Sequence, residues 1–274
     1  IYMENPINTK DPIIEQITIQ LESMKYSWNF AGLINFNNTI YPFGNDSKII
    51  GHIFEIAARE ALSMAAQKLG YIFQENPTQT VYPDFYFAIP NTDKLIAIDI
   101  KTTYRQSSSA SFKFTAGSFT SYLRNGTKNI VGHYDNYIKH YIIGFVYDRE
   151  ESPTTQCTHY EDRDSIIPAY KNVEFFVQEK YKIAGEQKGS GNTDNIGTIS
   201  ANSIEPFRLG YGPFSVLGEE IFEDYWRHYP KYTDTKKLYT NLPTYIEWKK
   251  QIGDPHATRI EYLYNTWRNN ITLY

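Results

Sequence analysis

Two acidic residues and a lysine interrupt the most apolar part of the chain. Asp84 opens the segment PDFYFAI, and Asp99 and Lys101 lie inside LIAIDIKTTY. Alternate residues of a strand share a face, so Asp99 and Lys101 point one way and Ile98 and Ile100 the other. An unpaired charge is costly to bury, so these charged side chains need partners.

A turn through residues 90–94 would bring Asp84 back beside Asp99. Two carboxylates can share a divalent cation such as Mg²⁺, which prefers oxygen ligands and keeps several waters. A lysine beside them could hold or deprotonate a water and offset charge developing on a phosphate. The alternative is a structural Asp–Lys pair at a strand end, with Asp84 as a turn residue.

A glycine-rich segment, GSGNT, is a second candidate site, suited to contacts with DNA bases. It consists of Gly189, Ser190, Gly191, Asn192 and Thr193. Glycines allow a close approach of the backbone, an Asn side chain can pair with the major-groove edge of adenine, and a Thr methyl can contact thymine. The alternative is a flexible hairpin tip. The spacing does not match a phosphate-binding P-loop.

Other common catalytic patterns are missing from the sequence. The six histidines, His140 among them, do not follow the HExxH spacing, so we interpret them as ordinary surface or core residues. There is also no G-x-S-x-G segment for a serine hydrolase. The single cysteine, Cys157, cannot form an internal disulfide or a cysteine-based zinc site.

Hydrophobic spacing predicts two helices near the N-terminus. The first begins at Asp11-Pro12 and ends near Tyr26, and the second is capped by Ser47 and stopped by Gly70. Between them, residues 29–41 suggest a short hairpin that turns at Asn37-Asn38.

The chain after Gly70 is richer in short β-type runs, at residues 71–73, 85–89, 95–104, 141–147 and 173–177. Nearly continuous apolarity in LIAIDI and YIIGFVY indicates strands covered on both faces. Helical spacing returns at 219–229, Asp254-Pro255 is expected to open a last helix, and 105–111 and 149–165 are polar loops. We therefore predict an α/β fold with a central mixed β-sheet flanked by helices, in one domain over residues 1–274.

Charge and hydropathy limit the classes of partner. The net charge of −4 argues against a protein that coats nucleic acid or membranes by bulk charge. Residues 226–274 nevertheless carry eight Lys or Arg against four Asp or Glu, which permits a local surface for phosphates. Without a long apolar run or a secretory start, we expect a soluble, intracellular protein with no membrane partner.

Pro83-Asp84 together with Asp99-Ile100-Lys101 resembles the PD-(D/E)xK motif of nucleases. The match extends further, to the EcoRV family of type II restriction endonucleases, over roughly residues 26–229. Ten segments are similar in the same order: IYPFGNDSK, IFE, YPDF, IAIDIKTTY, RNGTKNIV, IIGFVY, IAG, GSGNT, NIG and DYWR. The resemblance implies a restriction-endonuclease-like fold.

The resemblance also implies roles for residues of the acidic site. Asp84 and Asp99 become the principal metal ligands and Lys101 the catalytic lysine. Glu55, in IFE, matches a further acidic residue near the site and a third metal ligand, although a solvated helix carboxylate is the alternative. The implied cofactor is Mg²⁺, with Mn²⁺ as a substitute.

Further positions match DNA-contacting segments of that family. The loop 189–193 aligns with the major-groove recognition loop, and residues 78–81 align with a second DNA-facing loop in which only Gln79 clearly matches. Matches to residues near the DNA backbone are Ser47, Lys48, Thr102, Thr103, Lys128 and Arg227. Ser47 is equally suited to be a helix N-cap, and the others to a solvated surface.

The family resemblance implies a Mg²⁺-dependent endonuclease of double-stranded DNA, acting as a homodimer that associates near residues 13–41. It implies cutting at GATATC to give blunt ends with 5′-phosphates, in the cytoplasm of a prokaryote whose own DNA a cognate methyltransferase protects. Two alternatives remain open: a repair or structure-specific nuclease with the same acidic site, and a DNA-binding module that does not cleave.

Overall fold

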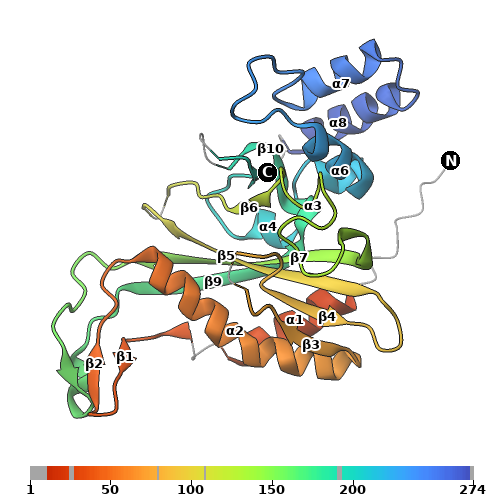
Figure 1. Cartoon of the computed structure of the whole chain (residues 1–274). Helices are drawn as coiled ribbons and strands as arrows, with labels where there is room; N and C mark the ends of the chain where they lie inside the picture. The colour runs from red at the N-terminus through yellow and green to blue at the C-terminus, as the bar shows by residue number, and fades with distance from the viewer. Residues whose placement is uncertain (1–10, 25–27, 79, 108, 190–192, 272–274) are drawn as a thin grey trace.

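A five-stranded mixed sheet forms the centre of the fold (Figure 1). The computed structural model describes residues 11–24, 28–78, 80–107, 109–189 and 193–271. The strands lie in the order β3 (Ile72–Glu75), β4 (Phe85–Ala88), β5 (Leu95–Arg105), β7 (Tyr137–Arg149) and β9 (Tyr170–Glu179). Only β5 and β7 run parallel, and the other neighbours are antiparallel. The predicted mixed sheet is confirmed, with most strands longer than expected.

Both faces of this sheet are covered, as the continuous apolar runs indicated. On β5, Ile96, Ile98 and Ile100 pack into a core shared with two N-terminal helices, whereas Ala97 packs into a second core on the opposite face. Asp99 and Lys101 follow Ala97 at a spacing of two, so they belong to the second face. The charged residues therefore lie at the edge of a buried layer.

The first core is covered by α1 (Pro12–Ser23) and α2 (Ser47–Leu69), which lie below the sheet in Figure 1. Asp11 caps α1 as predicted, and Gly70 ends α2 with a left-handed φ of 73°. The prediction that Ser47 caps α2 is wrong. Asp46 is the cap, because its carboxylate accepts hydrogen bonds from the backbone N–H groups of Lys48 and Ile49.

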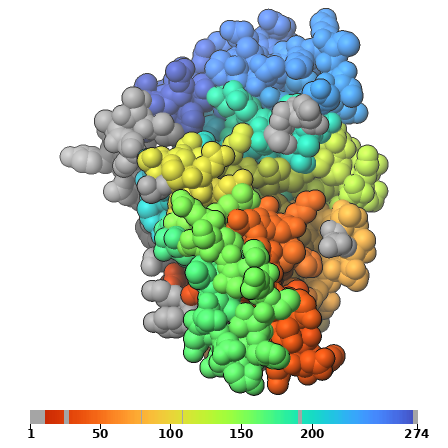
Figure 2. All heavy atoms as spheres, turned by 90° about the vertical axis from the view of Figure 1, so that its left-hand side faces the viewer, coloured from red at the N-terminus to blue at the C-terminus, as the bar shows by residue number. Residues whose placement is uncertain are grey.

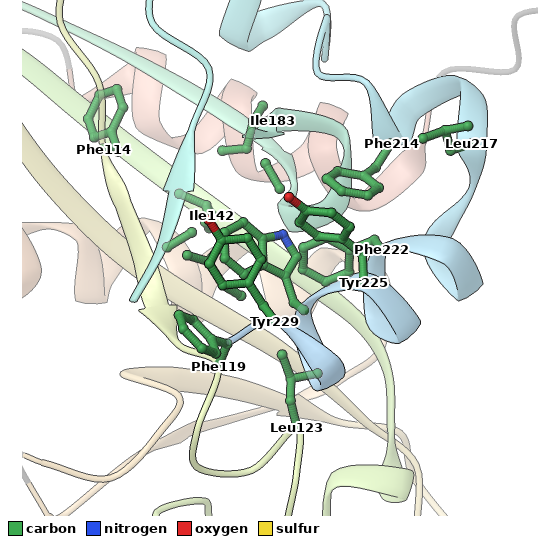
Figure 3. Packing of buried hydrophobic residues seen from close by; sticks show 14 of the residues in the cluster. Phe114, Phe119, Leu123, Ile142, Ile183, Phe214, Leu217, Phe222, Tyr225 and Tyr229 are labelled. Carbon is green, nitrogen blue, oxygen red and sulfur yellow. The ribbon is translucent and has the colours of Figure 1, made fainter. Parts of the chain in front are cut away.

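The second core lies above the sheet and contains most of the buried aromatic residues of the described chain (Figure 3). It is enclosed by a three-stranded sheet of β6 (Thr115–Ser118), β10 (Ala184–Lys188) and β11 (Asn195–Thr198). The helices around it are α3 (Lys180–Ile183), α4 (Glu205–Arg208), α5 (Phe214–Leu217), α6 (Glu219–His228), α7 (Leu242–Gln251) and α8 (Ala257–Ile271). The predicted helix at 219–229 is thus confirmed as α6.

Two of these helices depart from the prediction. The hydrophobic spacing did not predict α7, because its start is fixed by a reciprocal cap between Asn241 and Thr244 rather than by a clear apolar stripe. The last helix begins at Ala257, not at Asp254-Pro255. Asp254 instead accepts a hydrogen bond from the His256 N–H and pairs with Lys249, so it belongs to the turn before the helix.

A small sheet extends away from the main body at the lower left of Figure 1. It contains β1 (Leu33–Ile34) and β2 (Thr39–Tyr41), which confirm the predicted hairpin, and β8 (Thr158–His159) pairs with β2. Figure 2 shows these two parts of the chain, orange-red and green, at the lower end of one face. The polar loop expected at 149–165 therefore contains a short strand and a 3₁₀ helix, Tyr160–Ser165, which the pairing with β2 stabilises. Another 3₁₀ helix, Tyr134–Asn136, precedes β7.

Within the described residues, none of the helices is both long and apolar enough to cross a membrane.

Candidate active site

The β4–β5 hairpin brings the two predicted carboxylates together. Phe85 pairs with Ile98 across the hairpin, and the Ile100 N–H donates a 2.7 Å hydrogen bond to Asp84 Oδ2. On the same strand, Lys101 Nζ lies 2.7 Å from Asp99 Oδ2. The structure thus brings Asp84, Asp99 and Lys101 together in one cluster.

Burial and mutual repulsion give the two carboxyl groups different protonation behaviour. Burial raises the pKa of Asp84 to about 8, the charge of Asp99 adds to this effect, and Lys101 opposes it. Burial also acts to raise the pKa of Asp99, but Lys101 and Lys180 outweigh it and hold that pKa below its usual value. Without a cation, the pair therefore retains one proton at neutral pH.

Lys101 stays charged in this environment. Burial acts to lower its pKa, but Asp99 and Asp84 outweigh burial and raise the pKa above its usual value. The side chain is still 25% exposed, so the ammonium group can reach a molecule bound at the surface.

The raised pKa of Asp84 predicts how the stability of the protein in EDTA depends on pH. The unfolded chain releases this proton near pH 3.8 and the folded chain near pH 8, so the folded state holds an extra proton between these values. The contribution of Asp84 to the free energy of unfolding therefore falls as pH rises through this window. Asp84→Asn removes the effect and is expected to stabilise the protein by about 1–3 kcal/mol at pH 8.

Urea unfolding in EDTA at pH 5 and pH 8 measures this difference. Asp93→Asn is the matched control, because Asp93 lies in the turn of the same hairpin and its side chain is 72% exposed. An Asp84→Asn variant that is less stable than wild type at pH 8 would contradict the electrostatic account.

A buried lysine behind the cluster was not found from the sequence. Lys180 is 3% exposed, and its Nζ donates a 2.9 Å hydrogen bond to the Tyr122 hydroxyl and lies 4.1 Å from the centre of the Tyr82 ring. Burial lowers the pKa of Lys180 to about 8, with Asp99 opposing and Lys101 adding to the shift. Its position between the apolar runs FFV and IA of the sequence was the only available signal.

Tyr82 connects this lysine to a buried histidine. The Tyr82 hydroxyl lies 2.8 Å from His140 Nδ1, and burial holds the pKa of His140 well below its usual value. The sequence interpretation of His140 as an ordinary surface or core residue agrees with its burial. It did not indicate the contact with the residue that precedes Pro83-Asp84.

Glu55 lies beside the acidic cluster. It lines a cleft of about 320 Å³ together with Asp84, Thr78 and Val81, and its negative charge contributes to the raised pKa of Lys101. Its carboxylate is 2.8 Å from His52 Nδ1 on the preceding turn of α2. The structure thus brings Glu55 and the 78–81 loop to one cleft, whereas Gln79 lies outside the described residues.

Four of the predicted backbone-contact residues lie on α2 and β5. Ser47 and Lys48 are exposed in the first turn of α2. Thr102 faces α2, because a Cβ added at Gly51 would lie 3.6 Å from its hydroxyl. Thr103 shares the face of Lys101 and, like Thr102, is partly exposed.

Lys128 lies in an exposed turn that is attached to the segment before Asp84. Tyr82 pairs with Ile130, and the Tyr82 N–H donates to the Asn129 carbonyl at 3.0 Å. The guanidinium of Arg227, from α6, donates to the Leu123 carbonyl at 2.9 Å and pairs with Glu223. Arg227 therefore links α6 to the segment that carries Lys128.

The glycine-rich loop connects β10 to β11, so it is the tip of a hairpin. Ser190, Gly191 and Asn192 lie outside the described residues, and Thr193 is exposed. Gly189 is buried, and a Cβ at this position would lie only 2.8 Å from the Thr115 hydroxyl of β6. Glycine is therefore required where the loop leaves β10.

The cluster can hold a divalent cation through a small number of protein ligands. No set of three or more His, Cys, Asp or Glu side chains in the described part of the chain is arranged to bind a metal. A cation at Asp84 and Asp99 would thus take its remaining ligands from water and substrate oxygens, as Mg²⁺ commonly does. The Asp84 carboxyl group, whose raised pKa favours its protonated form without a cation, fits such a site because a cation can replace the proton.

The sequence of the chain is similar to those of known proteins. A family described as restriction endonuclease EcoRV matches residues 24–250. The type II restriction enzyme EcoRV of Escherichia coli is 42% identical over 231 residues, which cover 83% of this chain and 92% of that protein.

Proposed function

The chain belongs to the EcoRV restriction endonuclease family. We propose that it hydrolyses DNA at GATATC with the help of Mg²⁺, and that Asp84, Asp99 and Lys101 form its active site. The chain is a type II site-specific deoxyribonuclease and acts on double-stranded DNA. Two contacts support the proposed site. Asp84 Oδ2 accepts a 2.7 Å hydrogen bond from the Ile100 N–H, and Asp99 Oδ2 lies 2.7 Å from Lys101 Nζ.

Asp84 and Asp99 would hold Mg²⁺, with Glu55 as an additional acidic residue at the same cleft and Mn²⁺ as a substitute metal. When bound, the cation supplies Lewis-acid stabilisation of charge on the phosphate oxygens. The Ile100 N–H fixes the Asp84 carboxylate, and Lys101 is held beside Asp99. These contacts orient the Asp84 and Asp99 carboxylates before DNA binds.

Lys101 acts mainly through its charge, because its pKa is raised and its ammonium form is favoured. It orients the attacking water and offsets the negative charge that develops on the phosphate. Water attacks phosphorus in line with the 3′ oxygen. The P–O3′ bond breaks, the 3′ oxygen takes a proton, and a 5′-phosphate and a 3′-hydroxyl remain.

Base recognition is assigned to the loop 189–193, with Asn192 reading the outer base pairs in the major groove. The 78–81 loop, with Gln79, and the residues Ser47, Lys48, Thr102, Thr103, Lys128 and Arg227 would contact the DNA backbone or minor groove. The 78–81 loop has the strongest support, because Thr78 and Val81 line the same cleft as Asp84. Such an enzyme works in the bacterial cytoplasm, where a cognate DNA methyltransferase protects the host DNA.

Plasmid digestion with Mg²⁺ or with Ca²⁺ tests the proposal. With Mg²⁺ we expect discrete fragments, whereas Ca²⁺ should support DNA binding with little cleavage because its longer and looser coordination positions the water poorly. A smear or cleavage only at damaged DNA would favour a repair or structure-specific nuclease. Binding without any cleavage in Mg²⁺ would favour a non-cleaving module.

The symmetry of a palindromic target requires a second copy of the chain. The small sheet of β1, β2 and β8 exposes large apolar side chains, and β1 and β2 lie within the predicted dimer region 13–41. These exposed side chains support association of two copies through this sheet. They are Leu33, Ile34, Phe36, Tyr41 and the adjacent Tyr160, with Phe36 fully exposed. An apolar surface of this kind is typical of an interface between copies.

Sedimentation of the free protein is expected to give twice the chain mass of 31.9 kDa. Phe36→Asp should shift the protein toward the monomer, because a charge would be buried at the interface. Lys68→Asp, at the far end of α2, is the control and should leave the mass unchanged. A monomer mass for the wild type, both free and on a palindromic duplex, would rule out the dimer.

A further inference from the structure

The hairpin that carries the loop 189–193 is supported unequally by the rest of its sheet. β11 lies between β10 and β6, whereas β10 is an edge strand. The Gly189 N–H donates to the Asn195 carbonyl at 2.9 Å and closes the base of the loop. An edge strand has hydrogen-bonded neighbours on one side only, so β10 needs other contacts to keep its orientation.

One residue of β10, Glu186, makes these contacts with three different helices. Its carboxylate accepts a 2.9 Å hydrogen bond from the Leu242 N–H and lies close enough to the Tyr264 hydroxyl to add to the effect of burial, which raises the pKa of that group. Its carbonyl accepts from the Tyr225 hydroxyl at 2.5 Å. α6, α7 and α8 therefore meet at one position, three residues before the loop.

The helices that hold Glu186 are themselves fixed. The Tyr225 ring packs against Phe214 in the second core, where Figure 3 also shows Phe222. Leu242 is the first residue of α7, so its N–H has no partner inside the helix, and the positive end of the helix dipole favours a carboxylate. The contact of Glu186 with α7 is therefore directional and charge-assisted.

The other end of the loop is tied to the connection between α6 and α7. The Tyr232 N–H donates to Asp194 Oδ1 at 2.8 Å, and the Phe119 N–H donates to the Asp194 carbonyl at 3.0 Å. Both ends of the loop are thus joined to the region that follows α6.

Part of this support lies beyond the region shared with the family, which matches residues 24–250. α8 follows that region and buries Ile260 and Tyr264 against the rest of the protein. Its Trp267 donates a 2.9 Å hydrogen bond to the Tyr211 carbonyl. An element outside the family match therefore reaches the base of the recognition hairpin.

We propose that Glu186 is a specificity-determining positioning residue, through which α7 and α8 hold the β10–β11 hairpin in the orientation that reads the base pairs. This inference rests on the proposed recognition role of the loop 189–193. Glu186 lies on the hairpin and not in the loop, so it acts through the loop residues and not on the DNA itself.

The test compares cleavage at the site that the enzyme cuts with cleavage at a site altered in one outer base pair. Glu186→Ala is expected to lower the ratio of the two kcat/KM values about tenfold or more, the scale of one base contact. Glu186→Gln should retain most of the ratio, because its amide oxygen can still accept from the Leu242 N–H. Tyr264→Phe should lower the ratio less than Glu186→Ala does.

Two controls separate positioning from a general loss of stability. Tyr262→Phe changes a residue of α8 that is 66% exposed and should leave the ratio unchanged. Ala66→Gly weakens α2 on the opposite side of the sheet and should lower the thermal midpoint without lowering the ratio. The inference is overturned if Glu186→Ala discriminates like wild type, if Glu186→Gln fails to rescue, or if Ala66→Gly lowers the ratio equally.

Asn192→Ala in the same assay distinguishes this inference from the function on which it rests. If Asn192→Ala discriminates like wild type, the loop does not read the bases and the recognition proposal fails. If Asn192→Ala loses discrimination but Glu186→Ala does not, only the role of Glu186 is overturned.

Discussion

Lys101→Ala is expected to lower the rate of DNA cleavage by about 10²–10⁴-fold while the protein remains folded. The substitution removes the ammonium group that lies 2.7 Å from Asp99, and with it the charge that offsets the phosphate in the transition state. It removes little core volume, since the Lys101 side chain is partly exposed. Asp99→Ala should abolish cleavage similarly, because it removes a proposed metal ligand.

Single-turnover cleavage measures this loss, and circular dichroism with thermal melting shows that the variants are folded. Lys94→Ala is the matched control, because this lysine lies in the turn of the same β4–β5 hairpin and its side chain is 46% exposed. Its rate should stay within about twofold of wild type. Near wild-type cutting by Lys101→Ala or Asp99→Ala would remove the basis for the proposed active site.

Asn192→Ala is expected to have the next largest effect, on the choice of sequence. A lost bidentate contact to a base costs about 1–3 kcal/mol of discrimination, and a symmetric dimer loses it in both half-sites. The loss should concern the outer GA/TC pairs. The central TA step should keep its preference, because a flexible step can be selected through the energy of bending.

Competition between GATATC and singly altered duplexes measures the discrimination directly. Gln187→Ala is the control, since this residue is exposed on β10 of the same hairpin. An Asn192→Ala variant that still rejects altered outer pairs as strongly as wild type would show that other residues read them.

The sequence could predict the parts of the site that depend on local spacing. Asp99 and Lys101 share a face because strand periodicity is two, and Asp84 returns beside Asp99 because the connection at residues 90–94 is a tight turn. Gly70 ends α2 with a positive φ for a similarly local reason. In each of these cases, neighbouring residues alone determine the geometry.

The missed features depend on contacts between distant segments. Lys180 joins the site only because β9 crosses the sheet beside β7, which places its ammonium group against Tyr122, 58 residues earlier. β8 becomes a strand only by pairing with β2. The prediction that Ser47 caps α2 was wrong for a different reason. Asp46 and Ser47 are adjacent and both suit an N-cap, and the helix uses Asp46.

Sequencing the ends produced from a plasmid that carries GATATC and centre-substituted sites shows both where the enzyme cuts and which bases it reads. We expect Mg²⁺-dependent blunt ends with 5′-phosphates at the middle of GATATC. Cuts at altered centres would contradict only the bending argument. Cuts that ignore the outer GA/TC pairs would contradict the assignment of the loop 189–193 as the reader of the sequence.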